Sequence, residues 1–97
     1  MANTKIAKPS ISEINERFEV ISGSSNSFHD IVKSGVYYVG NNVTDKPNSV
    51  GGLYILSSAY GDNRVMCGLY VVNSADSTVR IYWVRCSNGT FEYKQAI

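Results

Sequence analysis

The sequence predicts a small, mainly β domain, an antiparallel β-sandwich or meander, preceded by a short N-terminal amphipathic helix. Two observations predict this fold. From Val36 onward, short runs of β-branched and aromatic residues alternate with turn residues, at the spacing typical of antiparallel strands. Before that point, residues 10–21 carry apolar side chains at a helical period. A chain of 97 residues has room for one domain with a modest core.

The predicted helix covers residues 10–21. Ser10 and Glu13 form an S-x-x-E capping box, which would satisfy early backbone N–H groups. Three helical turns are not stable alone, so the apolar seam must pack on a partner. That partner is either the chain's own β domain or copies of the chain at the end of a longer stalk. The seam recurs at steps of three, four and three residues, at Ile11, Ile14, Phe18 and Ile21.

A linker is predicted next, because residues 22–27 are small and polar. The chain is therefore divided into an N-terminal segment, residues 1–26, and a β domain, residues 27–97. The β domain is expected to open with a single helical turn that has Ser27 or Asp30 as its cap.

Five strands are predicted in the β domain. Asn88-Gly89 is a hairpin signal between the last two. Neither face of the fourth strand is purely polar, so we expect it to be covered on both sides or to meet a partner chain on one. A domain this small has little material to cover two faces, which favours an oligomer. The strands are expected at residues 36–39, 53–58, 64–72, 78–86 and 90–94.

Charge and hydropathy argue against several classes of function. The net charge is +1, whereas dedicated nucleic-acid binders carry a basic patch or stripe. No run approaches the roughly 18 apolar residues of a membrane span. Residues 1–10 lack the apolar stretch of a secretory signal peptide. We therefore expect no nucleic-acid partner, no membrane insertion and no signal peptide.

No catalytic residue, cofactor or metal site is predicted. His29 is the single histidine of the chain. The partners of a catalytic triad meet in space, and the side chain of the adjacent Asp30 would point away from that of His29. The segment around Asp45 lacks the closing Glu of a calcium loop. Cys67 and Cys86 are expected to be buried free thiols, with a disulfide between them as the open alternative. Two cysteines and one histidine are too few for a zinc site.

Aromatic and turn residues favour binding instead. Seven tyrosines and one tryptophan are many rings for so small a domain, and such side chains combine rigid contact area with a polar tip. The turn at residues 58–64 gathers groups that can stack on a sugar face and hydrogen-bond its hydroxyls. The unusually long connection of residues 40–52 is a second exposed loop. The predicted ligand-binding residues are Tyr60, Asp62, Asn63 and Arg64, with Asp45 and Asn48 in the connection.

The segment FHDIVKSGVYYVGNNVTDKPNSVGGLYIL resembles the opening of the knob domain found at the ends of R-type pyocin and phage tail fibres. The family pattern has an Asn/Asp-hydrophobic pair, then Gly-x-Tyr, then a polar segment with a central Pro and a Gly before the next strand. The matching residues are Asp30, Ile31, Gly35, Tyr37, Pro47, Gly51 and Gly52.

The C-terminal segment WVRCSNGTFEYKQAI matches the same family in outline, so the resemblance covers residues 27–97. Arg85 lies in the last-but-one strand and an Asn-Gly turn follows. Phe91 stands where a Trp is usual, Tyr93 arrives one residue early for the second Trp, and Trp83 replaces a Tyr. No binding role of the family's tryptophans is therefore transferred to these positions.

The resemblance implies a homotrimeric receptor-binding tip of a phage tail fibre or tail-like particle, made in the bacterial cytoplasm and carried on the virion. Its targets would be bacterial surface glycans, either lipopolysaccharide or wall polysaccharide. The seam that ends at Ile21 would then hold the trimer together. Two other functions stay open: a monomeric carbohydrate- or cell-wall-binding module of a lytic enzyme, and a structural baseplate or fibre component.

Overall fold

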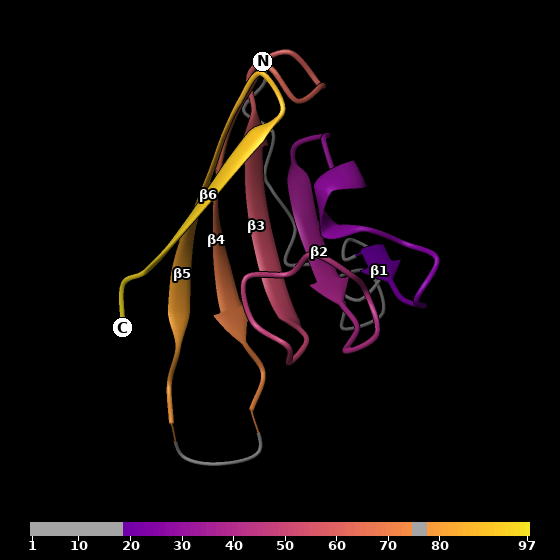
Figure 1. The fold of residues 1–97 in the computed structure, drawn as a ribbon, viewed down its shortest axis with the longest axis vertical. Coiled ribbons are helices and arrows are strands. Elements are labelled where there is room, and N and C mark those ends of the chain that lie inside the picture. Colours follow the sequence, from indigo (N-terminus) through magenta and orange to yellow (C-terminus); the bar gives the residue numbers. More distant parts are fainter. Residues whose placement is uncertain (1–18, 75–77) are drawn as a thin grey trace, which may run out of the picture.

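The computed structural model describes residues 19–74 and 78–97, which form one mixed sheet of six strands and one short 3₁₀ helix. The strands lie in the sheet in chain order (Figure 1). From β2 to β6 they form an antiparallel meander, whereas β1 pairs with β2 in parallel. The predicted mainly β fold is confirmed. The elements are β1 (Glu19–Ile21), the 3₁₀ helix η1 (Phe28–Asp30), β2 (Gly35–Val39), β3 (Gly52–Ser58), β4 (Val65–Val72), β5 (Ile81–Ser87) and β6 (Thr90–Gln95).

Local sequence signals account for several of these boundaries. Ser27 caps η1, and its side chain accepts a hydrogen bond from the backbone N–H of His29. Asn88 and Gly89 both have positive φ angles, 48° and 84°, as a two-residue hairpin turn requires. The five predicted strands are all present, although the fourth begins at Ile81 rather than at residue 78.

The predicted helix is wrong at its C-terminal end, because Glu19, Val20 and Ile21 form strand β1. The free edge of β2 offers unpaired backbone groups, and β-branched Val20 and Ile21 favour an extended chain that can pair with them. Ile21 packs against the chain's own core. The remainder of the predicted helix, with Ile11, Ile14 and Phe18, lies outside the described residues.

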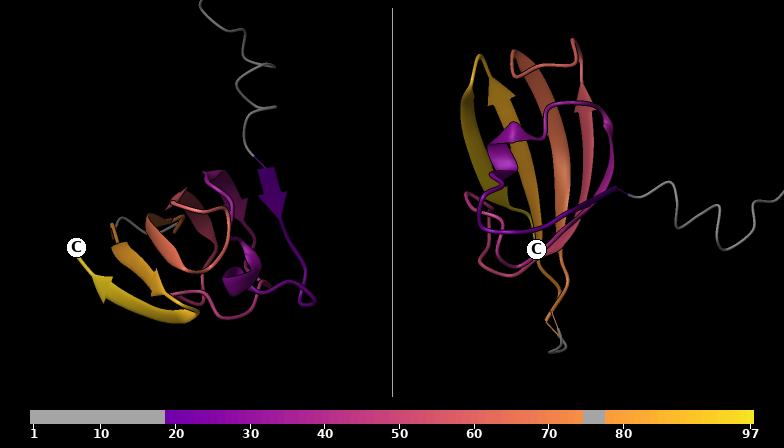
Figure 2. Two further views of the ribbon diagram at one scale, coloured as in Figure 1. Left: turned by 90° about the horizontal axis from the view of Figure 1, so that it is seen from above. Right: turned by 90° about the vertical axis from the view of Figure 1, so that its right-hand side faces the viewer.

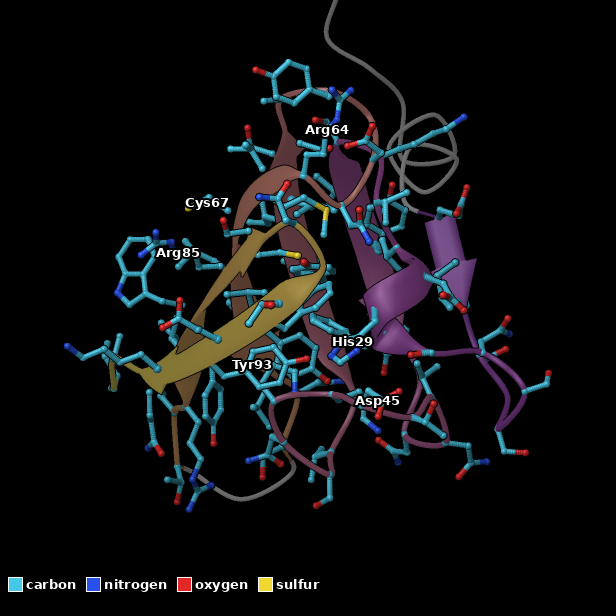
Figure 3. All side chains as sticks on the ribbon, turned by 45° about the horizontal axis from the view of Figure 1, so that its top comes forward. His29, Asp45, Arg64, Cys67, Arg85 and Tyr93 are labelled. Carbon is cyan, nitrogen blue, oxygen red and sulfur yellow. The ribbon has the colours of Figure 1, made fainter. Side chains whose placement is uncertain are left out.

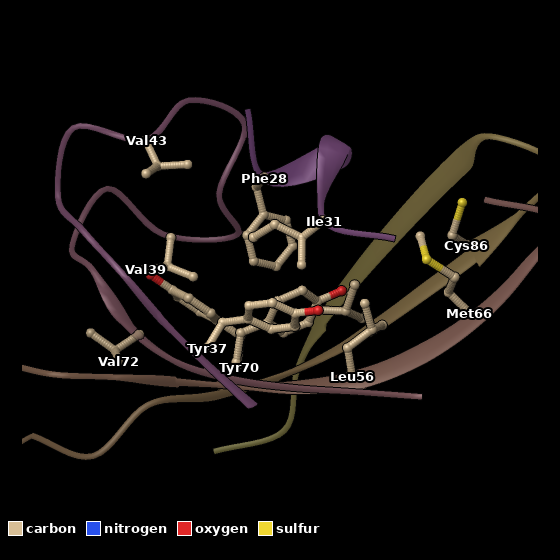
Figure 4. Close-up of a cluster of buried hydrophobic side chains, with 12 residues drawn as sticks. Phe28, Ile31, Tyr37, Val39, Val43, Leu56, Met66, Tyr70, Val72 and Cys86 are labelled. Atoms are coloured by element: carbon tan, nitrogen blue, oxygen red, sulfur yellow. The ribbon is translucent and has the colours of Figure 1, made fainter. Parts of the chain in front are cut away.

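The core covers one face of the sheet, here called the inner face. The 3₁₀ helix η1 lies on the concave side of the curved sheet (Figure 2). Its Phe28 is fully buried there (Figure 4). Its ring centroid lies 4.2 Å from that of Tyr54 and 5.5 Å from that of Tyr70. Strand pairing sets the tyrosines side by side, and the row runs through Tyr37, Tyr54, Tyr70 and Tyr82.

The long connection between β2 and β3 closes the inner face. Val43 is buried in the core cluster. The ammonium group of Lys46 donates to the backbone carbonyls of Asn41 and Val43, and the Asn41 side chain accepts from the N–H of Gly51 at 2.6 Å. The connection is therefore long because it folds back and covers one end of the core.

Removing the hydroxyl of either of two buried tyrosines is expected to change the stability of the domain, in opposite directions. The Tyr54 hydroxyl is buried and finds no hydrogen-bond partner among the described residues, whereas the Tyr70 hydroxyl donates to the Val50 carbonyl at 2.6 Å. An unpaired buried polar group costs about 1–3 kcal/mol, and a made hydrogen bond contributes about 1 kcal/mol. We expect Tyr54→Phe to raise the free energy of unfolding in urea and Tyr70→Phe to lower it. Losses of equal size in both variants would contradict the assignment.

Candidate functional site

The turn after β3 holds the first group of predicted binding residues. The Arg64 Nε donates to both carboxylate oxygens of Asp62 at 3.0 Å, and the guanidinium carbon lies 4.2 Å from the ring centroid of Tyr60. Hydrogen bonds from the side chain and backbone of Arg64, and then its charge, lower the pKa of Asp62. Tyr60 is 60% exposed, so its ring still offers surface to a ligand.

Asn63 joins this turn to the β5–β6 hairpin. Its carbonyl accepts from the N–H of Gly89 at 3.0 Å and from the Cys86 thiol at 3.3 Å. The four predicted residues of the turn therefore form one compact, exposed cluster at one end of the sheet.

Asp45 and Asn48 lie at the other end, so the structure does not unite the six predicted residues. Figure 3 shows Arg64 and Asp45 at opposite ends of the sheet. Asn48 donates to the Tyr82 hydroxyl at 3.0 Å and accepts from the N–H of Val50. These bonds tie the residue into the fold. The Asp45 carboxylate accepts from the Ser27 hydroxyl at 2.7 Å, and this bond is the main cause that lowers its pKa.

His29 fastens three segments together. Its Nε2 lies 2.7 Å from the Tyr93 hydroxyl, which itself donates to the Asp45 carbonyl at 2.7 Å. Because the Tyr93 proton goes to Asp45, His29 Nε2 is the donor in the first bond. The His29 ring also stacks on Phe91, with centroids 3.9 Å apart. These contacts join η1, the long connection and β6, which gives His29 a structural role.

The opposite face of the sheet, here called the outer face, carries features that sequence reasoning did not assign to a site. Trp83 is 50% exposed there. A cleft of about 400 Å³ beside it is lined by Trp83, Arg85, Glu92, Tyr93 and Lys94. A signal for it existed in the sequence. The Asn88-Gly89 turn fixes the β5–β6 register, which sets Trp83 opposite Lys94 and Arg85 opposite Glu92.

A second cavity, of about 300 Å³, lies between β1, η1 and β2. Glu19, Asn26 and Asp30 contribute polar groups to its lining. Its one aromatic lining residue, Tyr37, is buried, and burial is the main cause that raises the pKa of its hydroxyl. This cavity therefore offers no exposed ring to a ligand, unlike the cleft at Trp83.

The cysteines lie on different faces. Cys86 is buried and free, as predicted, but the prediction that Cys67 is buried is wrong. Alternation along β4 turns Cys67 to the outer face, together with its cross-strand partner Arg85 (Figure 3). Among the described residues, no three His, Cys, Asp or Glu side chains gather as a metal site would need. Within the same ranges, no helix is long and apolar enough to cross a membrane.

Comparisons with protein-family models, with curated proteins and with solved structures find no match to this chain.

Proposed function

We propose that this chain is the receptor-binding tip of a phage tail fibre or tail-like particle. It assembles as a homotrimer and adsorbs to a bacterial surface glycan, either lipopolysaccharide or wall polysaccharide. The resemblance over residues 27–97 suggests this class of protein. The observation that carries the proposal is the apolar character of the outer face of the sheet.

Strand pairing aligns the apolar side chains of the outer face into two neighbouring rows. The first row crosses five strands, a width of about 19 Å at the usual strand spacing. Monomeric soluble proteins rarely leave so contiguous an apolar surface in water, and such surfaces mark contacts with other molecules. The first row is Val20, Tyr38, Leu53, Val71 and Ile81, and the second is Val36, Ile55, Leu69 and Trp83.

Further copies of this chain are the partner that we propose for the two rows, with Trp83, at the end of the second row, left outside the contact. The predicted seam at Ile11, Ile14 and Phe18 precedes β1, where Val20 begins the first row. Copies that meet through the seam would therefore also be close at this face. Three weak glycan sites on one rigid tip then raise affinity through effective concentration, so a shallow site suffices.

Assembly is tested by light scattering on the full chain at micromolar concentration. We expect a trimer, and we expect Leu69→Lys, in the middle of the second row, to give a folded monomer. Tyr60→Ala, outside the rows, is the control that keeps the trimer. A wild-type chain that stays monomeric would contradict the proposal and favour a monomeric binding module.

Glycan binding is tested at the exposed turn. We expect Tyr60→Ala or Arg64→Ala to weaken adsorption of labelled trimer to susceptible cells and to a glycan array by roughly five- to tenfold. The reason is that each change removes ring surface or hydrogen-bond donors from the exposed cluster. Light scattering should show an unchanged trimer. Unaltered adsorption of both variants would place the binding site elsewhere, and failure of the wild-type trimer to bind any cell or glycan would favour a structural fibre component.

A further inference from the structure

The cleft on the outer face between β5 and β6 combines one exposed ring with three charged side chains. Trp83 is opposite Lys94, and Arg85 is opposite Glu92, so the four side chains stand on neighbouring strands and the same face. Opposed side chains in such a pair start about 5 Å apart at Cβ. At about 400 Å³, the cleft falls within the usual range for small-ligand sites.

The position of Trp83 suits stacking rather than core packing. Its neighbour in sequence, Val84, is buried on the inner face, while Trp83 stays half-exposed. Its cross-strand partner on β4 is Leu69, and its partner on β6 is the charged Lys94. The indole therefore stands at the margin of the apolar rows. The negatively charged face of an aromatic ring attracts the weakly positive C–H groups on one side of a sugar ring.

The charges of the cleft favour an anion. Arg85 and Glu92 are 4.0 Å apart and mostly exposed, so their ion pair is weak. Within residues 19–74 and 78–97, Lys94 makes no ion pair. Arg85 and Lys94 together outweigh the one carboxylate of Glu92. Their donors are suited to a carboxylate or phosphate group, to which charge-assisted hydrogen bonds are the strong ones.

We infer that this cleft binds one acidic sugar unit of the target glycan, a pyranose that bears a carboxylate or a phosphate group. The sugar ring stacks on Trp83, and the acidic group contacts Lys94 and Arg85. This inference rests on the proposed function for the choice of a glycan as ligand, and it adds a second site and a chemical class to the exposed turn at residues 58–64.

Trp83 is the single tryptophan of the chain, so its fluorescence reports on this cleft alone. The full chain is titrated with D-glucuronate, D-glucose 6-phosphate and neutral D-glucose at fixed protein concentration and fixed ionic strength. We expect a saturable change in emission for one or both acidic sugars at millimolar concentration, with at least tenfold weaker binding of glucose. The two acidic arms distinguish a carboxylate from a phosphate. Equal binding of all three sugars, or no saturable change, would overturn the inference.

Two charge variants are expected to change the dissociation constant of the acidic sugar in opposite directions. Lys94→Gln should raise the dissociation constant of the acidic sugar at least fivefold, and Glu92→Gln should lower it two- to threefold. Lys33→Gln, an exposed lysine away from the cleft, is the matched control and should change nothing. If Lys94→Gln and Lys33→Gln behave alike, the charge assignment is wrong. Trp83→Leu should abolish binding when it is measured by calorimetry.

The same fluorophore separates this inference from the proposed function. If copies of the chain cover Trp83, its emission will change with protein concentration and will not respond to sugar. That outcome would overturn the sugar site and leave the trimer supported. Failure of the wild-type chain and of every variant to adsorb to cells would instead count against the proposed function.

Discussion

Replacing Phe28 with alanine is expected to lower the free energy of unfolding by about 3–5 kcal/mol. Phe28 is fully buried and lies against Tyr54, Tyr70 and Tyr93, with ring centroids 4.2, 5.5 and 6.0 Å away. It is also the residue through which η1 covers the inner face of the sheet. Truncation removes the apolar contact and leaves a cavity that a sheet of paired strands cannot collapse to fill. A domain of this size has about 5–15 kcal/mol of stability in total, so the loss is a large fraction of it.

The measurement is urea unfolding followed by circular dichroism, with the slope of the transition compared between variants. Tyr60→Ala is the matched control, because it also truncates an aromatic ring but at a position that is 60% exposed. We expect the control to stay within about 0.5 kcal/mol of the wild type. A loss below about 1 kcal/mol in Phe28→Ala would mean that η1 does not hold the core together.

Alkaline pH is expected to unfold the domain steeply. Burial is the first cause that raises the pKa of the Tyr54, Tyr70 and Tyr93 hydroxyls well above the ordinary value of about 10. Below about pH 10 both the folded and the unfolded chain keep these protons. Above it, the unfolded chain loses protons that the folded chain retains, and the free energy of unfolding falls until the raised pKa is reached. Each tyrosine contributes about 1.4 kcal/mol per pH unit, so three contribute about 4 kcal/mol per pH unit.

This pH dependence is measured as urea unfolding midpoints at successive pH values, with tyrosinate absorbance recorded alongside. Absorbance should rise together with unfolding, because ionisation and loss of structure are linked. Tyr54→Phe removes one of the three groups, so we expect its stability to fall with pH about one third less steeply. A stability that does not change between pH 9 and pH 12 would show that these hydroxyls ionise without unfolding the core.

The two faces of the sheet are expected to take different roles. On the inner face, the tyrosine row, η1 and the long connection pack into one core. The hydrogen bonds that link His29, Tyr93 and Asp45 hold the edge of this core together. The outer face carries the apolar rows and the cleft at Trp83. Substitutions on the outer face are therefore expected to alter assembly or binding, whereas substitutions on the inner face alter folding.

Much of the fold could be predicted because its signals are local. The runs of β-branched and aromatic residues marked β2 to β6, and the Asn88-Gly89 turn marked the last hairpin together with its register. Ser27 or Asp30 was predicted as the cap of the helical turn, and Ser27 caps η1. The turn at residues 58–64 also brings its predicted binding residues into one cluster, because they are neighbours in sequence.

The remaining features depend on contacts between distant segments. Residues 19–21 form a strand because β2 presents a free edge with which they can pair. The helical spacing of apolar residues in this segment carries no information about that edge. Gly68 lies where a Cβ atom would meet the Ile55 carbonyl at 2.7 Å and the Tyr54 ring at 2.9 Å, a requirement that arises only after β3 and β4 pair. Asp45 is exposed, as expected of a loop residue, and Asn48 is half-buried, but their hydrogen-bond partners, Ser27 and Tyr82, come from distant parts of the chain.

The sequence by itself determined which segments become strands from β2 onward and which side chains share a face, since alternation is a property of each strand alone. Only the tertiary structure decided which face is covered. Val84 and Cys86 point to one side of β5, and Trp83 and Arg85 to the other. Both sides carry apolar atoms, so hydropathy cannot separate them. The choice follows from η1 and the long connection, which bring Phe28 and Val43 to one face and leave Trp83 exposed on the other.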